Sequence, residues 1–189
     1  LIRRERDLSK IAIIDLGGEE VPREFTYARL DAMANGVARA LVRRGLERGD
    51  RVAILSANRA EFIAAYFGIM RAGLVAVPVN FKFPRQTIHF ILSDAGAKLV
   101  FCDPPRCPDC PEDMLSVHFG DDGRDGFDRF LDAGAFEAVV PKPREPAMFL
   151  YTSGSTGTPK GVVLSHQSHI WVVETRLAPD LERHRYLIA

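Results

Sequence analysis

The sequence has no excess of either charge and no long apolar run. Its 25 acidic and 25 basic residues balance to a formal net charge of zero, which gives no indication of a nucleic-acid partner or of an anionic membrane surface. The longest apolar stretch, residues 62–70, is far shorter than the ~20 residues that a membrane-spanning helix needs. The first residues carry mixed charge and do not resemble a signal peptide, so we expect a cytoplasmic protein.

Cysteine is scarce, since only Cys102, Cys107 and Cys110 are present. Their spacing is similar to the start of a plant-type iron–sulfur pattern, and the last two alone could indicate zinc. However, the chain has no fourth cysteine, the nearest histidine is His118, and the proline-rich acidic segment 103–114 is typical of an exposed loop. We therefore expect reduced thiols in a reducing compartment, with Cys102 buried at a strand end and the others at the surface. A metal site is the alternative.

The remaining composition is that of an ordinary globular protein. Apolar residues make up 47% and charged residues 26% of the 189 residues, which is compatible with one sizeable domain or part of a larger one. Short apolar runs predict buried strands at residues 12–16, 51–55, 74–79, 98–102 and 117–119. Apolar residues at helical spacing predict helices over 26–45, 58–73, 84–96 and 127–135, and from Ser165 or His166 through Trp171 and Val173.

Capping residues set the expected ends of these helices. Thr26 is a suitable N-cap for the first helix, and Asn58 with Glu61 three residues later indicates the start of the second. Gly45 and Gly73 follow the last apolar positions of the same helices, where glycine commonly ends a helix.

The alternation of strands and helices predicts an α/β fold. Crossovers of this kind produce a largely parallel sheet that has helices on both faces. The proline-rich, charged segment 139–146 is expected to be a connector into the glycine-rich segment that follows it. Trp171, on the last predicted helix, is expected in the core, because large aromatic side chains dominate core burial.

Residues 151–161, Tyr-Thr-Ser-Gly-Ser-Thr-Gly-Thr-Pro-Lys-Gly, have the composition of a phosphate-binding loop. Glycine lets the backbone approach an anion closely, and successive N–H groups can form an anion-binding nest. Hydroxyl groups and one lysine add donors and positive charge. The apolar runs 147–151 and 162–164 predict a strand on each side. The sequence therefore predicts a loop that is held between two strands and offered to a polyphosphate.

Two other interpretations of this segment are less consistent with the residues. A Walker-type P-loop needs Gly-Lys-Ser/Thr at the start of a helix, whereas here Lys160 precedes Gly161 and an apolar run that favours a strand. A flexible Ser/Gly linker would lack both the flanking strands and the Pro-Lys pair.

Residues 149–166 resemble the phosphate-loop signature of the acyl-adenylate-forming superfamily, and 149–160 match it at every position. That superfamily includes acyl-CoA synthetases, non-ribosomal peptide adenylation domains and firefly luciferase. Four further blocks resemble the amino-terminal part of acyl-CoA synthetases in order and spacing: 25–27, 49–55, 72–80 and 91–97. The resemblance implies that residues 1–189 are a partial N-terminal adenylation domain. The later motifs of that domain and the C-terminal domain are absent, so we expect the isolated chain to be inactive.

The resemblance also implies a reaction in two steps. A carboxylate attacks the α-phosphorus of Mg-ATP to give an acyl-adenylate and pyrophosphate, and the thiol of coenzyme A then takes the acyl group. The implied phosphate-binding residues are Thr152, Ser153, Gly154, Ser155, Thr156, Gly157, Thr158 and Lys160. Lys160 is also the expected catalytic residue, because its charge would stabilise the leaving pyrophosphate. Thr152 is the candidate Mg²⁺ ligand, with a role as a cap of the loop as the equal alternative.

The carboxylic acid is not identified, because the residues expected to form its pocket follow the phosphate loop. Coenzyme A is the favoured acceptor. Two other functions stay open: a truncated, non-catalytic relative that binds nucleotide or a partner, and an unrelated NTP-hydrolysing domain, which would have a helix at 161–164. Open sheet edges would also allow the chain to self-associate.

Overall fold

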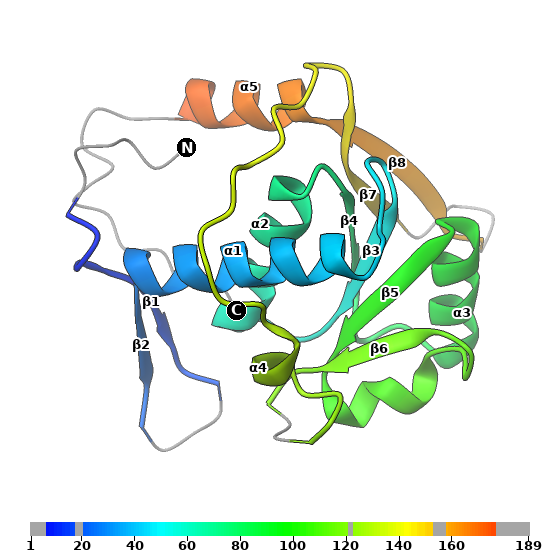
Figure 1. Cartoon of the computed structure of the whole chain (residues 1–189). Coiled ribbons are helices and arrows are strands. Elements are labelled where there is room, and N and C mark those ends of the chain that lie inside the picture. The colour runs from blue at the N-terminus through cyan, green and yellow to red at the C-terminus, as the bar shows by residue number, and fades with distance from the viewer. Residues whose placement is uncertain (1–6, 18–20, 121–122, 153–157, 177–189) are drawn as a thin grey trace.

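The computed structural model describes residues 7–17, 21–120, 123–152 and 158–176. Its centre is a six-stranded sheet in the order β6-β5-β3-β4-β7-β8 (Figure 1). The strands are β3 (Arg51–Leu55), β4 (Val75–Val79), β5 (Ala97–Cys102), β6 (Leu115–His118), β7 (Pro146–Thr152) and β8 (Lys160–Ser165). All neighbours are parallel except β7 and β8, which form an antiparallel pair. The predicted α/β fold with a largely parallel sheet is confirmed.

Helices cover both faces of this sheet, as the alternating pattern predicts. Helices α1 (Tyr27–Arg43) and α2 (Ala60–Arg71) pack on one face, and α3 (Arg85–Asp94) packs on the other. Strand β3 shows the consequence, because Val52 and Ile54 belong to the first core cluster while Ala53 and Leu55 belong to the second. This alternation follows from the two-residue period of a strand.

Three shorter or later elements complete the described chain. A 3₁₀ helix, η1 (Pro104–Asp109), follows β5. Helix α5 (His166–Arg176) follows β8 and begins at His166, one of the two starts that the sequence predicts. The helix expected over 127–135 is only a single turn, α4 (Phe127–Phe130). No helix in the described part of the chain is both long and apolar enough to cross a membrane.

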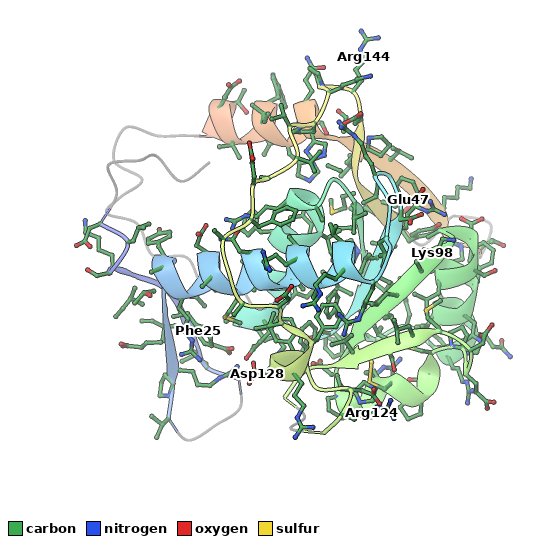
Figure 2. All side chains as sticks on the ribbon, in the orientation of Figure 1. Phe25, Glu47, Lys98, Arg124, Asp128 and Arg144 are labelled. Atoms are coloured by element: carbon green, nitrogen blue, oxygen red, sulfur yellow. A yellow bond between two sulfur atoms is a disulfide. The ribbon has the colours of Figure 1, made fainter. Side chains whose placement is uncertain are left out.

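A two-stranded antiparallel hairpin precedes α1 and lies apart from the main sheet (Figure 1). It consists of β1 (Ile11–Asp15), which was predicted, and β2 (Arg23–Thr26), which was not. Arg23 joins it to α2, since its guanidinium lies 2.6 Å from the Asp15 carboxylate and 2.7 Å from that of Glu61. Phe25, labelled in Figure 2, is fully buried at the end of the hairpin.

The predicted helix ends are confirmed with one exception. The Thr26 hydroxyl accepts a hydrogen bond from the Arg29 N–H at 3.1 Å, and Gly45 and Gly73 have φ values of 82° and 75° after their helices. The prediction that Asn58 caps α2 is wrong, because α2 begins at Ala60. The Ala60 N–H donates instead to the Asp15 carboxylate at 3.1 Å, so the cap comes from the distant hairpin.

The expectation of three reduced cysteines is also wrong in this structure. Cys102 is buried at the end of β5, as predicted, but its sulfur is bonded to that of Cys107. Cys110 is the free thiol, and it is buried rather than exposed. The proline-rich segment forms η1, which turns Cys107 back toward the strand end.

Candidate phosphate-binding site

The candidate site lies at the end of the β7–β8 hairpin. Thr152 is the register partner of Lys160, and Tyr151 is the partner of Gly161, so the two ends of the predicted loop meet across paired strands. The candidates Ser153, Gly154, Ser155, Thr156 and Gly157 lie outside the described residues. Their proposed contacts with phosphate therefore stay predictions.

The described candidates point into solvent. Thr152, Thr158 and Lys160 are all exposed, and Pro159 between the last two is half-buried. The side chain of Lys160 is thus available to an anion in solution. The role of Thr152 as a Mg²⁺ ligand stays a prediction.

Tyr151 anchors the hairpin to the rest of the domain. Its hydroxyl donates a hydrogen bond to the Asp94 carboxylate at 2.6 Å, across 57 positions of sequence, and the residue is only 8% exposed. Burial, and then the hydrogen bond to Asp94, raise the pKa of Tyr151 above its ordinary value, so the phenol stays protonated and keeps donating. The strand that leads into the loop is therefore fixed to the last residue of α3.

Gly161 lets the Tyr151 ring lie directly over β8. A Cβ atom added at Gly161 would stand 3.1 Å from Cζ and 3.3 Å from the hydroxyl oxygen of Tyr151. Real Cβ contacts are rarely so close, which means that a side chain here would displace the ring. The sequence indicated only that Gly161 belongs to the phosphate-loop signature. The structure shows that Gly161 makes room for the Tyr151 ring, whose hydroxyl anchors the hairpin to Asp94.

The connector 139–146 supports the other end of the hairpin. The N–H groups of His166 and Gln167, at the start of α5, donate to the carbonyl oxygens of Glu145 (3.1 Å) and Pro143 (2.8 Å). Arg48 holds the Glu145 carboxylate at 2.6 Å. The connector thus serves as the cap of α5, a function that its proline content did not reveal.

The two histidines of α5 differ in their surroundings. Burial, and then the neighbouring His169, lower the pKa of His166 below its ordinary value. His169 has a partner at each ring nitrogen: its Nε2 lies 2.9 Å from the Tyr66 hydroxyl and its Nδ1 lies 3.0 Å from the Ser165 carbonyl oxygen. An Nδ1–H that donates to this carbonyl leaves Nε2 to accept from Tyr66, which joins α5 to α2.

Two further expectations have a clear outcome. Trp171 is 63% exposed, so the prediction that it lies in the core is wrong. Residues 161–164 are part of strand β8. The NTP-hydrolysing alternative would have a helix at these positions, and it therefore loses its structural support.

Comparison with known proteins agrees with this geometry. Residues 3–188 match the family model described as "AMP-binding enzyme". The long-chain-fatty-acid–CoA ligase FadD13 of Mycobacterium tuberculosis is 38% identical over 153 residues, which are 76% of this chain and 30% of that protein. A linear gramicidin synthase of Brevibacillus parabrevis is 34% identical over 159 residues, which are 79% of this chain and 3% of that protein.

The fold is also found among solved structures. The crystal structure of ATP-bound MatB from Rhodopseudomonas palustris has a TM-score of 0.73 and 32% identity to this chain, covering 89% of it and 35% of MatB. This chain therefore spans about a third or less of the length of the proteins that it matches.

Proposed function

Because this chain belongs to the family of AMP-binding enzymes, we propose that it forms the phosphate-binding part of an acyl-CoA synthetase. In the complete enzyme a carboxylate attacks the α-phosphorus of ATP, pyrophosphate leaves, and the thiol of coenzyme A then takes the acyl group from the adenylate. The observation that carries the proposal is the β7–β8 hairpin, which is anchored by Tyr151 and presents Lys160 to solvent beside the glycine-rich segment.

The described residues have distinct parts in this chemistry. Lys160 places a positive charge beside the β- and γ-phosphates, where negative charge builds up on the leaving pyrophosphate. Thr152 ends β7 opposite Lys160, and its hydroxyl is a candidate ligand of the Mg²⁺ ion that accompanies ATP. The anchor at Asp94 keeps these groups in place before ATP arrives, which lowers the cost of ordering them on binding.

For the substrate and the acyl acceptor, only a chemical class is proposed. One relative is named for long-chain fatty acids and CoA, and another for the synthesis of a linear peptide. We favour a carboxylic acid and coenzyme A in a cytoplasmic reaction, and we expect the 189-residue chain alone to give no ATP–pyrophosphate exchange. Measurable exchange with any carboxylate would contradict that expectation.

Calorimetric titration with ATP, with and without Mg²⁺, tests the function of the loop. Lys160→Ala should weaken Mg-ATP binding by about tenfold or more, since it removes a charge-assisted contact of about 1.5–3 kcal/mol. Lys98→Ala removes an equally exposed lysine from β5 and should leave binding unchanged. Equal affinities for the two variants would count against the proposed role of Lys160.

We also propose that the chain associates with itself through its β8 edge. Val162, Val163 and Trp171 are 44%, 59% and 63% exposed on the last strand of the sheet and on α5. An open apolar strand edge of this kind can pair with a second copy. Light scattering should show a molar mass that increases with concentration and that Val163→Lys reduces, whereas a strictly monomeric wild type would refute the proposal.

A further inference from the structure

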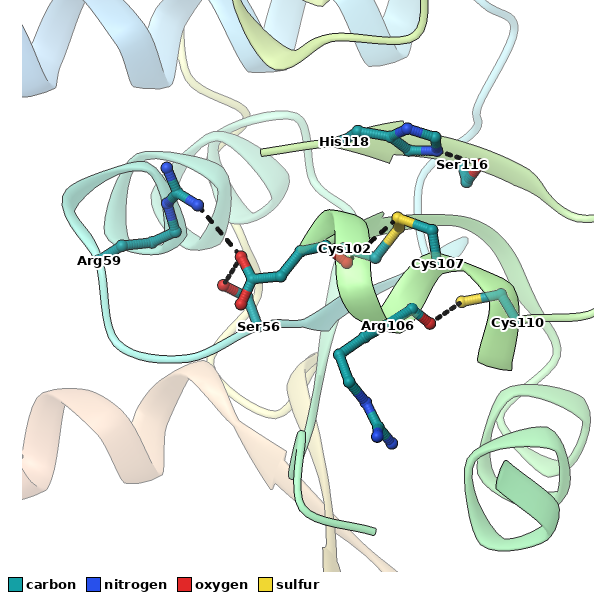
Figure 3. The surroundings of a disulfide bond; sticks show 9 residues. Ser56, Arg59, Cys102, Arg106, Cys107, Cys110, Ser116 and His118 are labelled. Atoms are coloured by element: carbon teal, nitrogen blue, oxygen red, sulfur yellow. Dashed lines mark hydrogen bonds and ion pairs between the residues drawn. A yellow bond between two sulfur atoms is a disulfide. The ribbon is translucent and has the colours of Figure 1, made fainter. Parts of the chain in front are cut away.

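Three side chains with metal-binding atoms meet at the edge of the sheet that lies opposite the β8 edge. Cys102 ends β5, His118 ends β6, and the two residues are register partners in this parallel pair. Cys107 lies on η1, and its sulfur is bonded to that of Cys102, beside the ring of His118 (Figure 3). One ligand atom from each of the three residues lies within 4.8 Å of the other two.

The fold holds Cys107 in this position independently of its bond to Cys102. The carbonyl oxygen of Asp103, at the start of η1, accepts a hydrogen bond from the Cys107 N–H at 3.1 Å. The carboxylate of Asp103 accepts further bonds from the Ser56 hydroxyl at 2.8 Å, the Ala57 N–H at 2.8 Å and the Arg59 guanidinium at 3.1 Å. Reduction would therefore leave the two sulfurs close together.

The third group is also held in place and accessible. The Ser116 hydroxyl lies 3.0 Å from Nε2 of His118, which restrains the ring on β6. A cavity of about 450 Å³ opens beside these residues and is lined by Cys107, Ser116 and His118 among others. Cys102 is fully buried while Cys107 and His118 are half-buried, so an ion and a water molecule can reach the cluster from the cavity side.

A site with two thiolates and an imidazole binds Zn²⁺ in preference to Mg²⁺ or Ca²⁺, which prefer oxygen ligands. A tetrahedral ion with Zn–S bonds of about 2.3 Å separates its sulfur ligands by about 3.7 Å. Bonded sulfurs cannot satisfy this distance, so a disulfide and a zinc ion exclude each other at this place. Reduction of the bond would supply both thiolates.

We propose that the reduced protein binds one Zn²⁺ through Cys102, Cys107 and His118, with water as the fourth ligand. The disulfide is then the oxidised, metal-free state of the same site. An oxidant such as oxidised glutathione takes two electrons from the two thiolates. The Cys102–Cys107 bond forms, the S–S bond of the oxidant breaks to give two glutathione thiolates, which take up protons from water, and Zn²⁺ is released.

Cys110 provides the matched control. It directly follows the C-terminal end of η1, its Sγ is 4.0 Å from the Arg106 carbonyl oxygen, and it is not part of the three-residue cluster. Burial, and then the charge of Asp109, raise the pKa of Cys110 to about 11, which keeps the thiol protonated at neutral pH.

The test is a zinc titration of the chain after reduction, in competition with a chromophoric chelator and without oxygen. Wild type and Cys110→Ser should each bind one Zn²⁺, while Cys107→Ser and His118→Gln should bind at least tenfold more weakly. With Co²⁺ in place of Zn²⁺, the thiolate-to-cobalt absorption band should appear in wild type and be weakened in Cys107→Ser. Wild-type binding no tighter than that of Cys107→Ser would overturn the proposal.

Oxidation of the zinc-loaded chain tests the second half. Oxidised glutathione should release one Zn²⁺ to a fluorescent indicator for every two protein thiols that are lost, in wild type and in Cys110→Ser alike. If the chain kept its zinc after both thiols had been oxidised, the disulfide and the zinc ion would not exclude each other, and this part of the proposal would be overturned. Circular dichroism of each variant shows whether it is folded, so that weaker binding is attributable to the missing ligand.

Discussion

The centre of the sheet and its β7–β8 edge are stabilised in different ways. Side chains of β3 and β4 such as Ile54 and Val77 are fully buried between helices, whereas Val162 and Val163 on β8 face solvent. The centre is held by many apolar contacts of similar kind. At the loop end of the hairpin that carries the candidate site, polar contacts matter more, chiefly the hydrogen bond from Tyr151 to Asp94, together with the close approach at Gly161. Substitutions in the centre should therefore change mainly the stability, whereas substitutions at the hairpin should also change the candidate site.

The largest expected difference between the two regions is in the free energy of unfolding. Ile54→Ala removes a fully buried side chain and should cost about 2–5 kcal/mol. Val163→Ala removes a similar side chain that is 59% exposed, and it should cost about 0.5 kcal/mol or less. Urea denaturation of both variants measures the difference, and similar losses would mean that the two regions do not differ as described.

Close packing of α1 against α2 should give the next largest effect. A Cβ atom added at Gly68 would stand 2.5 Å from Cβ of Val37 and 2.7 Å from the Ala34 carbonyl oxygen. Gly68→Ala should therefore destabilise the fold by about 1–3 kcal/mol. Gly36→Ala is the control, because the atoms nearest to its new methyl would be in the Leu131 side chain, at 3.3 Å, and the Asp132 carbonyl oxygen, at an ordinary 3.6 Å. A smaller loss for Gly68→Ala than for Gly36→Ala would show that the helices can separate.

Tyr151→Phe should give a smaller stability change than Ile54→Ala or Gly68→Ala but should also affect the site. It removes the hydrogen bond to Asp94 and should cost about 1–2 kcal/mol, together with a loss of ATP affinity. Tyr66→Phe removes a hydroxyl that contacts His169 instead, and it should leave ATP binding unchanged. Calorimetric titration with Mg-ATP compares the two variants, and an equal loss of affinity in both would contradict a specific role for the Asp94 anchor.

The contribution of Tyr151 should also depend on pH. Its pKa in the folded chain is raised above the ordinary value of about 10, so folding favours the protonated phenol. This stabilisation is fully present below about pH 10 and is lost as the pH rises above that value. Wild type should thus lose more stability than Tyr151→Phe between about pH 9 and about pH 11, within the range where the chain still folds reversibly. A constant difference across this range would contradict the assignment.

The sequence predicts the central elements well because their signals are local. An apolar run after Gly49 and Asp50 gives β3 with the bounds that the structure shows, and hydroxyl capping by Thr26 gives the start of α1. Strand β2 was missed because Arg23–Thr26 has little apolar alternation, and the start of α2 was misplaced because its cap comes from Asp15.

The parts of the site that the sequence did not reveal all depend on distant contacts. The composition and the signature of residues 151–161 predict a phosphate loop. The anchor at Asp94 lies 57 positions from Tyr151, and nothing local marks it. Similarly, His118 meets Cys102 only because β5 and β6 pair in parallel register, and η1 then brings Cys107 to both.

The most direct test of the central claim is an NMR titration of the chain with Mg-ATP, in which backbone amide shifts are followed residue by residue. The account predicts saturable shifts concentrated at residues 152–161 and at Asp94, which are lost in Lys160→Ala, with little change at Cys102 and His118. Shifts centred elsewhere, or equal shifts in wild type and Lys160→Ala, would contradict a phosphate site on the β7–β8 hairpin.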